Sequence, residues 1–199
     1  MSGDALSGGF ADPVFDAQAT FRAALDALSR PGRIVALGQR VAPPAPLLPA
    51  AAAVIAALAD DGTPVFLDPA LDTEPVRGWI AFHTGAPVTR DPAAAAFAVV
   101  GNPSEMLAFS VFAQGTAEYP DRAATLILQV AALDGGTPLV LSGPGIATAA
   151  TLAPRPLPPD FAGRMRANRA LFPLGLDVVL AAPEALAGLP RSVRIEEGG

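Results

Sequence analysis

Short apolar runs bounded by turn residues alternate with helical segments along this chain, and this alternation restricts the possible folds more than any other feature of the sequence. Residues 63–68 and 97–100 have the length and composition of buried strands. Apolar residues at helical spacing predict helices at 16–29, 47–60, 72–84, 104–113 and 160–172. Because strands and helices alternate, the helices should cover a sheet, as in α/β proteins.

The strongest strand signal lies at 124–133, and the turn Asp134-Gly135-Gly136 leads from it into a second strand at 137–141. This arrangement predicts an antiparallel hairpin. A hairpin interrupts the alternation, so we expect a mixed sheet and not a wholly parallel one. Other strands are expected at 33–37, 177–181 and 191–196, with a helical turn at 183–188. A chain of 199 residues without a long linker should form one domain over 1–199.

The predicted first and last helices each have an apolar face. In the first helix, with Asp16 as the expected N-cap, the residues spaced for burial are Phe21, Ala24, Leu25 and Leu28. In the last helix they are Phe161, Met165, Asn168 and Phe172, and the residues turned away are Arg164, Arg166 and Arg169. Asn168 interrupts an apolar stripe, so its amide needs hydrogen-bond partners if it is buried.

The residue types that are missing exclude several chemistries. All 13 basic residues are arginines, there is no cysteine, and His83 is the single histidine. A Schiff base to pyridoxal phosphate and a P-loop both need a lysine, and thiol nucleophiles or thiolate metal sites need a cysteine. Paired-histidine metal sites cannot form within one chain, so no metal site is expected. Ser-His-Asp catalysis would have to use His83, but the Gly-x-Ser-x-Gly elbow is absent.

Charge and hydropathy bear on the partners of the chain and on its cellular compartment. The net charge of -6 opposes the electrostatics of nucleic-acid binding, so no nucleic-acid partner is expected. No uncharged apolar stretch reaches 18 residues, so no membrane span is expected. Residues 1–12 lack the basic start and apolar block of a secretory signal. We therefore expect a cytoplasmic protein.

Several short segments occur in an order typical of one known family. They are Phe21-Arg22, Ser29-Arg30-Pro31-Gly32, Thr63-Pro64-Val65-Phe66-Leu67, Phe82-His83-Thr84-Gly85-Ala86-Pro87, Ala124-Thr125-Leu126-Ile127-Leu128-Gln129-Val130, Gly143-Pro144-Gly145-Ile146, Phe172-Pro173-Leu174-Gly175-Leu176-Asp177 and Leu189-Pro190-Arg191. In these motifs the chain resembles the PhnH family, the H subunits of bacterial carbon-phosphorus lyase. The resemblance covers residues 12–194, nearly the whole chain.

This resemblance implies a homodimer with a mixed-sheet, three-layer fold similar to pyridoxal phosphate-dependent transferases, but without that or any other cofactor. It implies a core complex with the G, I and J subunits. In the family, G, H and I act with an L subunit to join methylphosphonate to the ribose of ATP. Adenine is released, and alpha-D-ribose 1-methylphosphonate 5-triphosphate is formed. The J subunit then breaks the carbon-phosphorus bond at an iron-sulfur cluster, which a chain without cysteine cannot hold.

Two motifs have both a functional and a structural interpretation. His83 is the natural proton donor or acceptor for catalysis, or else a helix-terminal histidine that binds backbone carbonyls. Gly143 and Gly145 follow a predicted strand. They either let a phosphate approach the backbone amides or form a tight loop that packs Ile146.

The polar candidate residues also have both a functional and a structural interpretation. Arg22 and Arg191 are candidates for substrate or partner binding, and the alternative is an ion pair with Asp26 or Asp177. Asn168 is a candidate for a subunit contact. The arginines at 164, 166 and 169 could meet a triphosphate or a partner's carboxylates, or form a solvated helix face.

Three functional hypotheses follow. In the first, the chain contributes to catalysis but depends on its partners. In the second, it is a non-catalytic scaffold that organises the core complex. In the third, it is a free-standing small-molecule binder with its site at a dimer interface. The sequence leaves open whether the chain is itself an enzyme.

Overall fold

The computed structural model describes residues 7–198. The first six residues, on which the expected lack of a secretory signal partly depends, lie outside this part. The helices are α1 (Pro13–Ser29), α2 (Pro49–Leu58), α3 (Glu74–Thr84) and α4 (Phe161–Ala170). The strands are β1 (Val35–Ala36), β2 (Val65–Leu67), β3 (Val88–Thr89), β4 (Phe97–Val100), β5 (Thr125–Gln129), β6 (Leu139–Ser142), β7 (Ala150–Leu152), β8 (Asp177–Ala182), β9 (Ala185–Leu189) and β10 (Arg194–Glu197).

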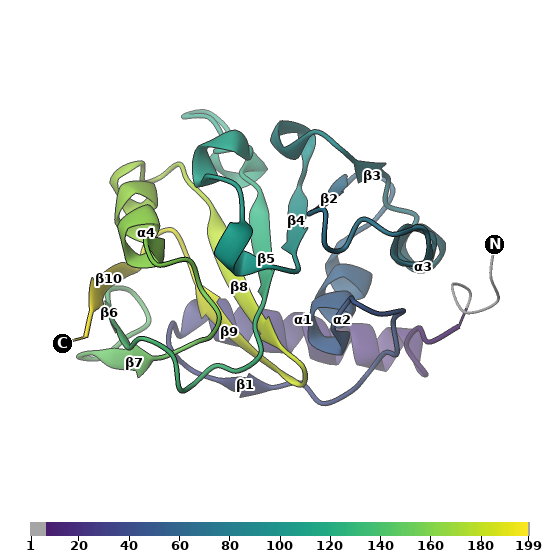
Figure 1. The fold of residues 1–199 in the computed structure, drawn as a ribbon, viewed down its shortest axis with the longest axis horizontal. Helices are drawn as coiled ribbons and strands as arrows, with labels where there is room; N and C mark the ends of the chain where they lie inside the picture. The colour runs from purple at the N-terminus through teal and green to yellow at the C-terminus, as the bar shows by residue number, and fades with distance from the viewer. Residues whose placement is uncertain (1–6, 199) are drawn as a thin grey trace.

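The described part contains a seven-stranded sheet of order β1-β9-β8-β5-β4-β2-β3 (Figure 1). The strands from β8 to β3 in this order are parallel, β9 is antiparallel to β8, and β1 is antiparallel to β9. The predicted mixed α/β sheet is therefore confirmed. A second, three-stranded sheet has the order β10-β6-β7.

The predicted hairpin between 124–133 and 137–141 is wrong. β5 lies between β4 and β8, and β6 leaves the large sheet to pair with β10 and β7. Four of the five β5 residues are buried, which is typical of a central parallel strand with a neighbour on each edge. Both edges of β5 are thus occupied, and no edge remains for a hairpin partner.

The antiparallel pair of the large sheet is instead the hairpin β8–β9, where a helical turn at 183–188 was predicted. The run Ala185–Leu189 is rich in alanine and leucine and favours a helix locally. Tertiary packing overrides this preference, because α1 crosses β9 at Gly188. A Cβ atom at Gly188 would lie 2.5 Å from the carbonyl oxygen of Ala27, so only glycine lets the helix and strand approach this closely.

The helix predicted at 104–113 is also wrong. The chain forms short 3-10 turns at Pro103–Glu105 and Phe109–Val111 instead. Met106, Phe109 and Phe112 are nevertheless buried. Their spacing of three residues matches the period of a 3-10 turn, which explains why the pattern predicted burial correctly and helix type incorrectly.

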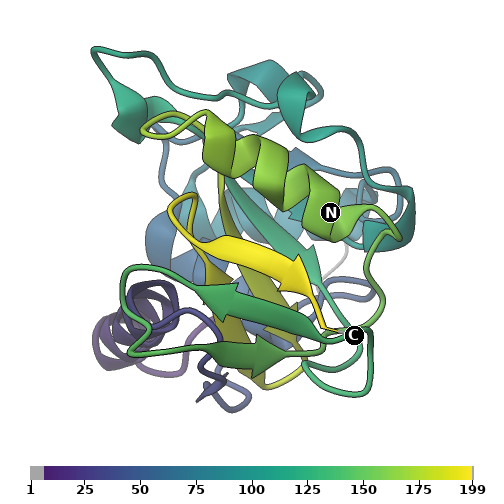
Figure 2. The ribbon, with the colours of Figure 1, turned by 90° about the vertical axis from the view of Figure 1, so that its left-hand side faces the viewer.

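The two faces of the large sheet are covered differently. Alternate residues of β5 enter separate cores, with Leu126 and Leu128 on one face and Ile127 on the other. The Ile127 face is covered by α1, α2 and α3, with Trp79 fully buried. The opposite face is covered by α4 and the three-stranded sheet, which lie together in Figure 2. No helix in residues 7–198 is long and apolar enough to cross a membrane.

Helix α1 differs from the prediction in its N-cap residue and in the side chains that it buries. Asp12 and not Asp16 is its N-cap, and its carboxylate accepts hydrogen bonds from the backbone N–H groups of Val14 and Phe15. The predicted apolar face is wrong for Phe21 and Leu25, which are 45% and 50% exposed. The residues that α1 buries are small: Thr20, Ala24 and Ala27. Small side chains permit the close approach of α1 to β9, and the large ones point outward.

Candidate functional site

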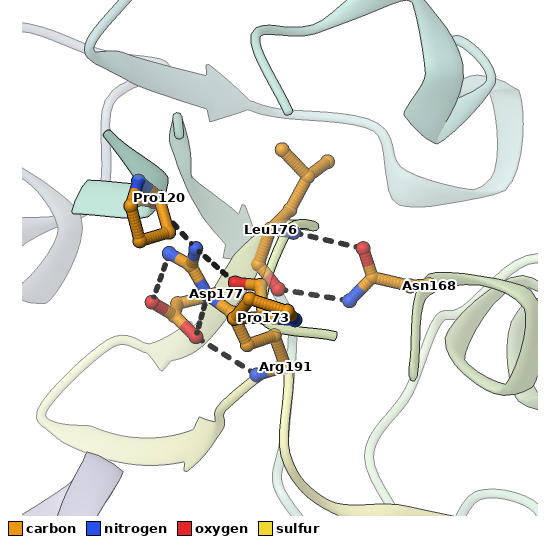
Figure 3. Close-up of polar contacts among 6 residues, drawn as sticks. All are labelled: Pro120, Asn168, Pro173, Leu176, Asp177 and Arg191. Carbon is orange, nitrogen blue, oxygen red and sulfur yellow. Dashed lines mark hydrogen bonds and ion pairs between the residues drawn. The ribbon is translucent and has the colours of Figure 1, made fainter. Parts of the chain in front are cut away.

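Arg191, a motif residue just after β9, forms several hydrogen bonds and an ion pair with other segments of the chain. Its Nη2 and Nε atoms donate to the Asp177 carboxylate at 2.7 and 3.2 Å, and Nη1 donates to the carbonyl of Pro120 at 2.7 Å and of Pro173 at 3.3 Å (Figure 3). The backbone N–H of Arg191 also donates to Asp177 at 2.8 Å. The two side chains are 14% and 26% exposed. The ion-pair interpretation of Arg191 is confirmed, with Asp177 as the partner.

Asn168 of α4 is 3% exposed and binds the backbone of Leu176 in both directions. Its Nδ2 donates to the Leu176 carbonyl at 2.9 Å, and its Oδ1 accepts from the Leu176 N–H at 2.8 Å (Figure 3). The predicted need for hydrogen-bond partners is therefore confirmed. The partners lie within this chain, in the loop that leads into β8. Asn168 thus positions the segment from which Asp177 reaches Arg191.

Gly143 and Gly145 lie in a loop between the segment that follows Arg191 and the end of α1. A Cβ at Gly145 would lie 2.0 Å from the carbonyl oxygen of Ser29, and one at Gly143 would lie 3.3 Å from that of Ser192. Both glycines have positive φ, at +127° and +82°. Ile146 packs against the core. The tight-loop interpretation fits these contacts, and the loop brings the motifs around Ser29, Gly143 and Arg191 together.

The three arginines of α4 separate into two groups. Arg164 is bound to Asp160 and to the backbone carbonyls of Met106 and Leu107. The other two, Arg166 and Arg169, line a pocket of about 420 Å³ with Arg194 of β10. Arg194 was not predicted to belong to this group, because it lies 24 positions beyond the end of α4 and only the fold places β10 beside that helix.

His83 lies far from these residues, in α3 at the opposite end of the long axis from α4 (Figure 1). Its Nε2 lies 3.3 Å from the carbonyl oxygen of Ser7, and its ring lies against that of Trp79, tilted by 46° with 4.6 Å between the centroids. A pocket of about 350 Å³ lies beside the ring, lined in part by Gly8 and Gly9. The contact with a backbone carbonyl is the one that the structural interpretation of His83 predicts.

Arg22 is exposed on α1, and the predicted pairing with Asp26 is wrong. Asp26 instead binds Arg30 at 2.7 Å and Arg33 at 3.4 Å. Within residues 7–198, Arg22 has no ion pair and no side-chain hydrogen bond. The side chain is therefore available for an external contact beside the exposed Phe21.

The predicted site residues thus do not form one active site. Asn168, Arg191, Gly143 and Gly145 lie in one region, and their contacts hold segments of this chain together. His83 and Arg22 lie elsewhere. Among the described residues there is no group of three or more histidine, aspartate or glutamate side chains that could hold a metal ion.

These features define a mixed α/β protein in which Asn168, Arg191 and Gly145 connect segments of the scaffold, and in which Arg22, Arg166 and Arg194 lie at the surface without an ion pair to the described residues. The chain belongs to the PhnH family, described as bacterial phosphonate metabolism proteins, whose family model matches residues 8–196. Its relatives include the "Alpha-D-ribose 1-methylphosphonate 5-triphosphate synthase subunit PhnH" of Rhizobium meliloti (strain 1021), 49% identical over 190 residues, which are 96% of this chain and 95% of the relative.

A second relative matches a smaller part of the chain. This is the "Putative C-P lyase subunit protein HtxG" of Stutzerimonas stutzeri, 33% identical over 85 residues, which are 43% of this chain and 44% of that protein. The family predicted from the motif order is therefore confirmed.

Proposed function

We propose that this chain is the H subunit of an alpha-D-ribose 1-methylphosphonate 5-triphosphate synthase and acts in the breakdown of organic phosphonates. The observation that carries the proposal is the 49% identity to the Rhizobium meliloti subunit of that name, over nearly the full length of both proteins. In this proposal the chain acts with G, I and L subunits on ATP and methylphosphonate, with release of adenine. The J subunit is a further partner in the core complex.

The chemistry of the chain supports dependence on partners. It lacks lysine and cysteine altogether, and its one histidine contacts a backbone carbonyl. The side chains of Arg191 and Asn168 both form hydrogen bonds with groups of the same chain. Transfer of a ribosyl group needs residues that bind, orient and stabilise charge in the transition state. We propose that the partners supply most of these groups, and that His83 is the candidate within this chain for a proton transfer.

The proposal predicts that adenine release requires the assembled complex. The purified chain mixed with ATP and methylphosphonate should release no adenine above the buffer blank, and addition of the G, I and L subunits should give steady release. The measurement is adenine by liquid chromatography, and the matched control contains G, I and L without this chain. Adenine released by the lone chain at an enzymatic rate would contradict dependence on partners.

A non-catalytic scaffold is the second candidate function. The observation that favours it is that the motif residues Asn168, Arg191 and Gly145 all serve contacts within the chain. A scaffold would tolerate loss of any surface arginine that leaves assembly intact. Alanine variants of exposed arginines that have no partner in the described chain separate the two functions, because they leave these internal contacts in place.

We further propose that the chain forms a homodimer through α1. The outward face of this helix exposes Val14 (73%), Phe21 and Leu25, which follow one another at spacings of seven and four residues. Such a stripe is self-complementary about a two-fold axis, as an isologous interface requires. A face of this kind is unusual on a chain that stays alone.

Phe21→Asp is expected to convert the dimer into a monomer at micromolar concentration, because it places a carboxylate in an apolar interface. Light scattering after size-exclusion chromatography measures the mass. Phe82→Asp is the matched control, because Phe82 is a similarly exposed (56%) phenylalanine of another helix, and it should leave the dimer intact. A dimer that survives Phe21→Asp would rule out α1 as the interface.

Two broader predictions remain proposals. We propose that the fold is related to that of pyridoxal phosphate-dependent transferases without using the cofactor, supported by the large mixed sheet and by the missing lysine. We also propose a single cytoplasmic domain over 1–199. The large sheet supports the single domain, because both of its faces contribute to the core and it pairs strands from the first part of the chain, such as β1, with strands from the last part, such as β9.

A further inference from the structure

The pocket between α4 and β10 carries an unusual concentration of positive charge for a chain with a net charge of -6. Arg166 and Arg169 come from the helix and Arg194 from the strand, which lie side by side in Figure 2. Glu196 is the single carboxylate that lines the pocket. Three guanidinium groups against one carboxylate leave an excess of positive charge at this place.

The charges of these arginines are not neutralised within the described chain. Arg166 and Arg194 are exposed and form no ion pair or side-chain hydrogen bond with any of residues 7–198. The Nε of Arg169 donates to the carbonyl of Ser192 at 3.0 Å, and its guanidinium lies 5.3 Å from the centroid of the Phe172 ring. These two contacts fix the orientation of Arg169 while its terminal nitrogens have no acceptor in the described part.

We propose that Arg166, Arg169 and Arg194 bind the triphosphate group of a nucleotide or ribosyl substrate. Guanidinium groups match phosphate oxygens in geometry and form strong, charge-assisted hydrogen bonds with them. Several arginines around one cavity suit a ligand with several adjacent phosphates. A volume of about 420 Å³ lies within the range of small-molecule sites, whereas a contact with an acidic protein surface needs no such hollow.

This inference deepens the proposed function and rests on it for the identity of the ligand, because the product named for the Rhizobium meliloti relative is a 5-triphosphate. The binding chemistry itself rests on the arginines alone. Direct binding and turnover therefore test the two proposals separately.

Isothermal titration calorimetry of the full chain with tripolyphosphate, ATP and adenosine tests the site. Tripolyphosphate and ATP should bind and adenosine should not, because the site recognises phosphate groups. Arg166→Ala and Arg194→Ala should each weaken tripolyphosphate binding about tenfold or more, the value of one charge-assisted hydrogen bond. Both arginines are exposed and unpaired within the described chain, so these variants should fold.

Two further variants control for net charge. Arg90→Ala removes another exposed arginine, between β3 and β4, and should leave tripolyphosphate binding unchanged. Glu196→Gln removes the competing carboxylate and should strengthen binding several-fold. The inference is overturned if tripolyphosphate fails to bind at low ionic strength, or if Arg166→Ala and Arg194→Ala bind it as tightly as Arg90→Ala does.

The same variants in the reconstituted complex separate a ligand site from a protein contact. The triphosphate site predicts intact assembly with a raised KM for ATP. A different result would overturn the inference: the wild-type chain binds no tripolyphosphate, and the arginine variants fail to assemble with the other subunits. That result would show that an acidic surface of a partner subunit occupies the pocket. Wild-type chain that binds tripolyphosphate but supports no adenine release would leave the anion site standing and contradict the proposed function.

Discussion

Arg191→Ala is expected to lower the free energy of unfolding by about 3 kcal/mol, one of the two largest effects predicted for a single substitution in this chain. The substitution leaves the half-buried carboxylate of Asp177 without its cation. It also removes the donor to the carbonyls of Pro120 and Pro173, which belong to two separate loops. Each loss leaves a polar group without its partner, and water only partly replaces the lost hydrogen bond.

The measurement for Arg191→Ala is urea denaturation followed by circular dichroism, with the midpoint of thermal unfolding as a second readout. A change of about 3 kcal/mol corresponds to a fall in Tm of about 6 to 12 °C for a chain of this size. The matched control is Arg30→Ala, which breaks the pair with Asp26 at the same 2.7 Å distance but with Arg30 58% exposed. That variant should cost less than about 1 kcal/mol. Equal costs for the two variants would show that burial of the Asp177–Arg191 pair contributes nothing.

The general architecture could be predicted because hydrophobic periodicity reports local structure and burial. The strand at 97–100 has the predicted bounds, and the alternation of strands and helices correctly predicted a sheet covered by helices. The sheet is mixed as predicted, but its antiparallel pairs are β8–β9 and β1–β9 and not the predicted hairpin. The errors occur where partners distant in sequence decide the structure. Residues 183–188 form part of a hairpin because α1 packs on Gly188, and no local pattern contains that information.

The hairpin predicted after 124–133 failed for a related reason. A short turn between two strands specifies pairing only if the edge of the first strand is free, and both edges of β5 are occupied by β4 and β8. The face of α1 illustrates the opposite limit. Its periodicity predicted one buried apolar face, but Phe21 and Leu25 of that face point to the surface of the chain. Periodicity alone cannot distinguish a face buried in the core from one available to a second subunit.

The contacts of the site residues could be predicted only where a buried polar group requires a hydrogen-bond partner. The need of Asn168 for hydrogen bonds followed from this rule. The pairing of Arg191 with Asp177 was one of two alternatives, and the structure shows the ion pair. Exposed groups carry no such requirement. The pairing of Arg22 with Asp26 was therefore wrong, and the approach of Arg194 to the arginines of α4 depends on the placement of β10 by the fold.

Gly175→Ala is expected to destabilise the chain by about 3 to 4 kcal/mol, because it combines backbone strain with disruption of the Asn168–Leu176 contact. Gly175 has φ +102°, which side-chain-bearing residues rarely adopt. A Cβ there would lie 2.7 Å from Oδ1 of Asn168 and 3.0 Å from its backbone oxygen. The alanine must therefore displace the amide that holds the buried Leu176 backbone, in the loop that leads to Asp177.

Gly38→Ala separates the two causes. Gly38 also has positive φ, at +69°, but a Cβ there would meet no atom within 4 Å, so this variant should cost only about 1 kcal/mol from backbone strain. Hydrogen exchange gives a local readout, because the Leu176 N–H should lose its protection in Gly175→Ala and keep it in Gly38→Ala. Similar unfolding free energies for the two variants, with Leu176 protected in both, would mean that the Asn168 amide does not hold this loop. The geometry that places Asp177 against Arg191 would then have to arise from the strands alone.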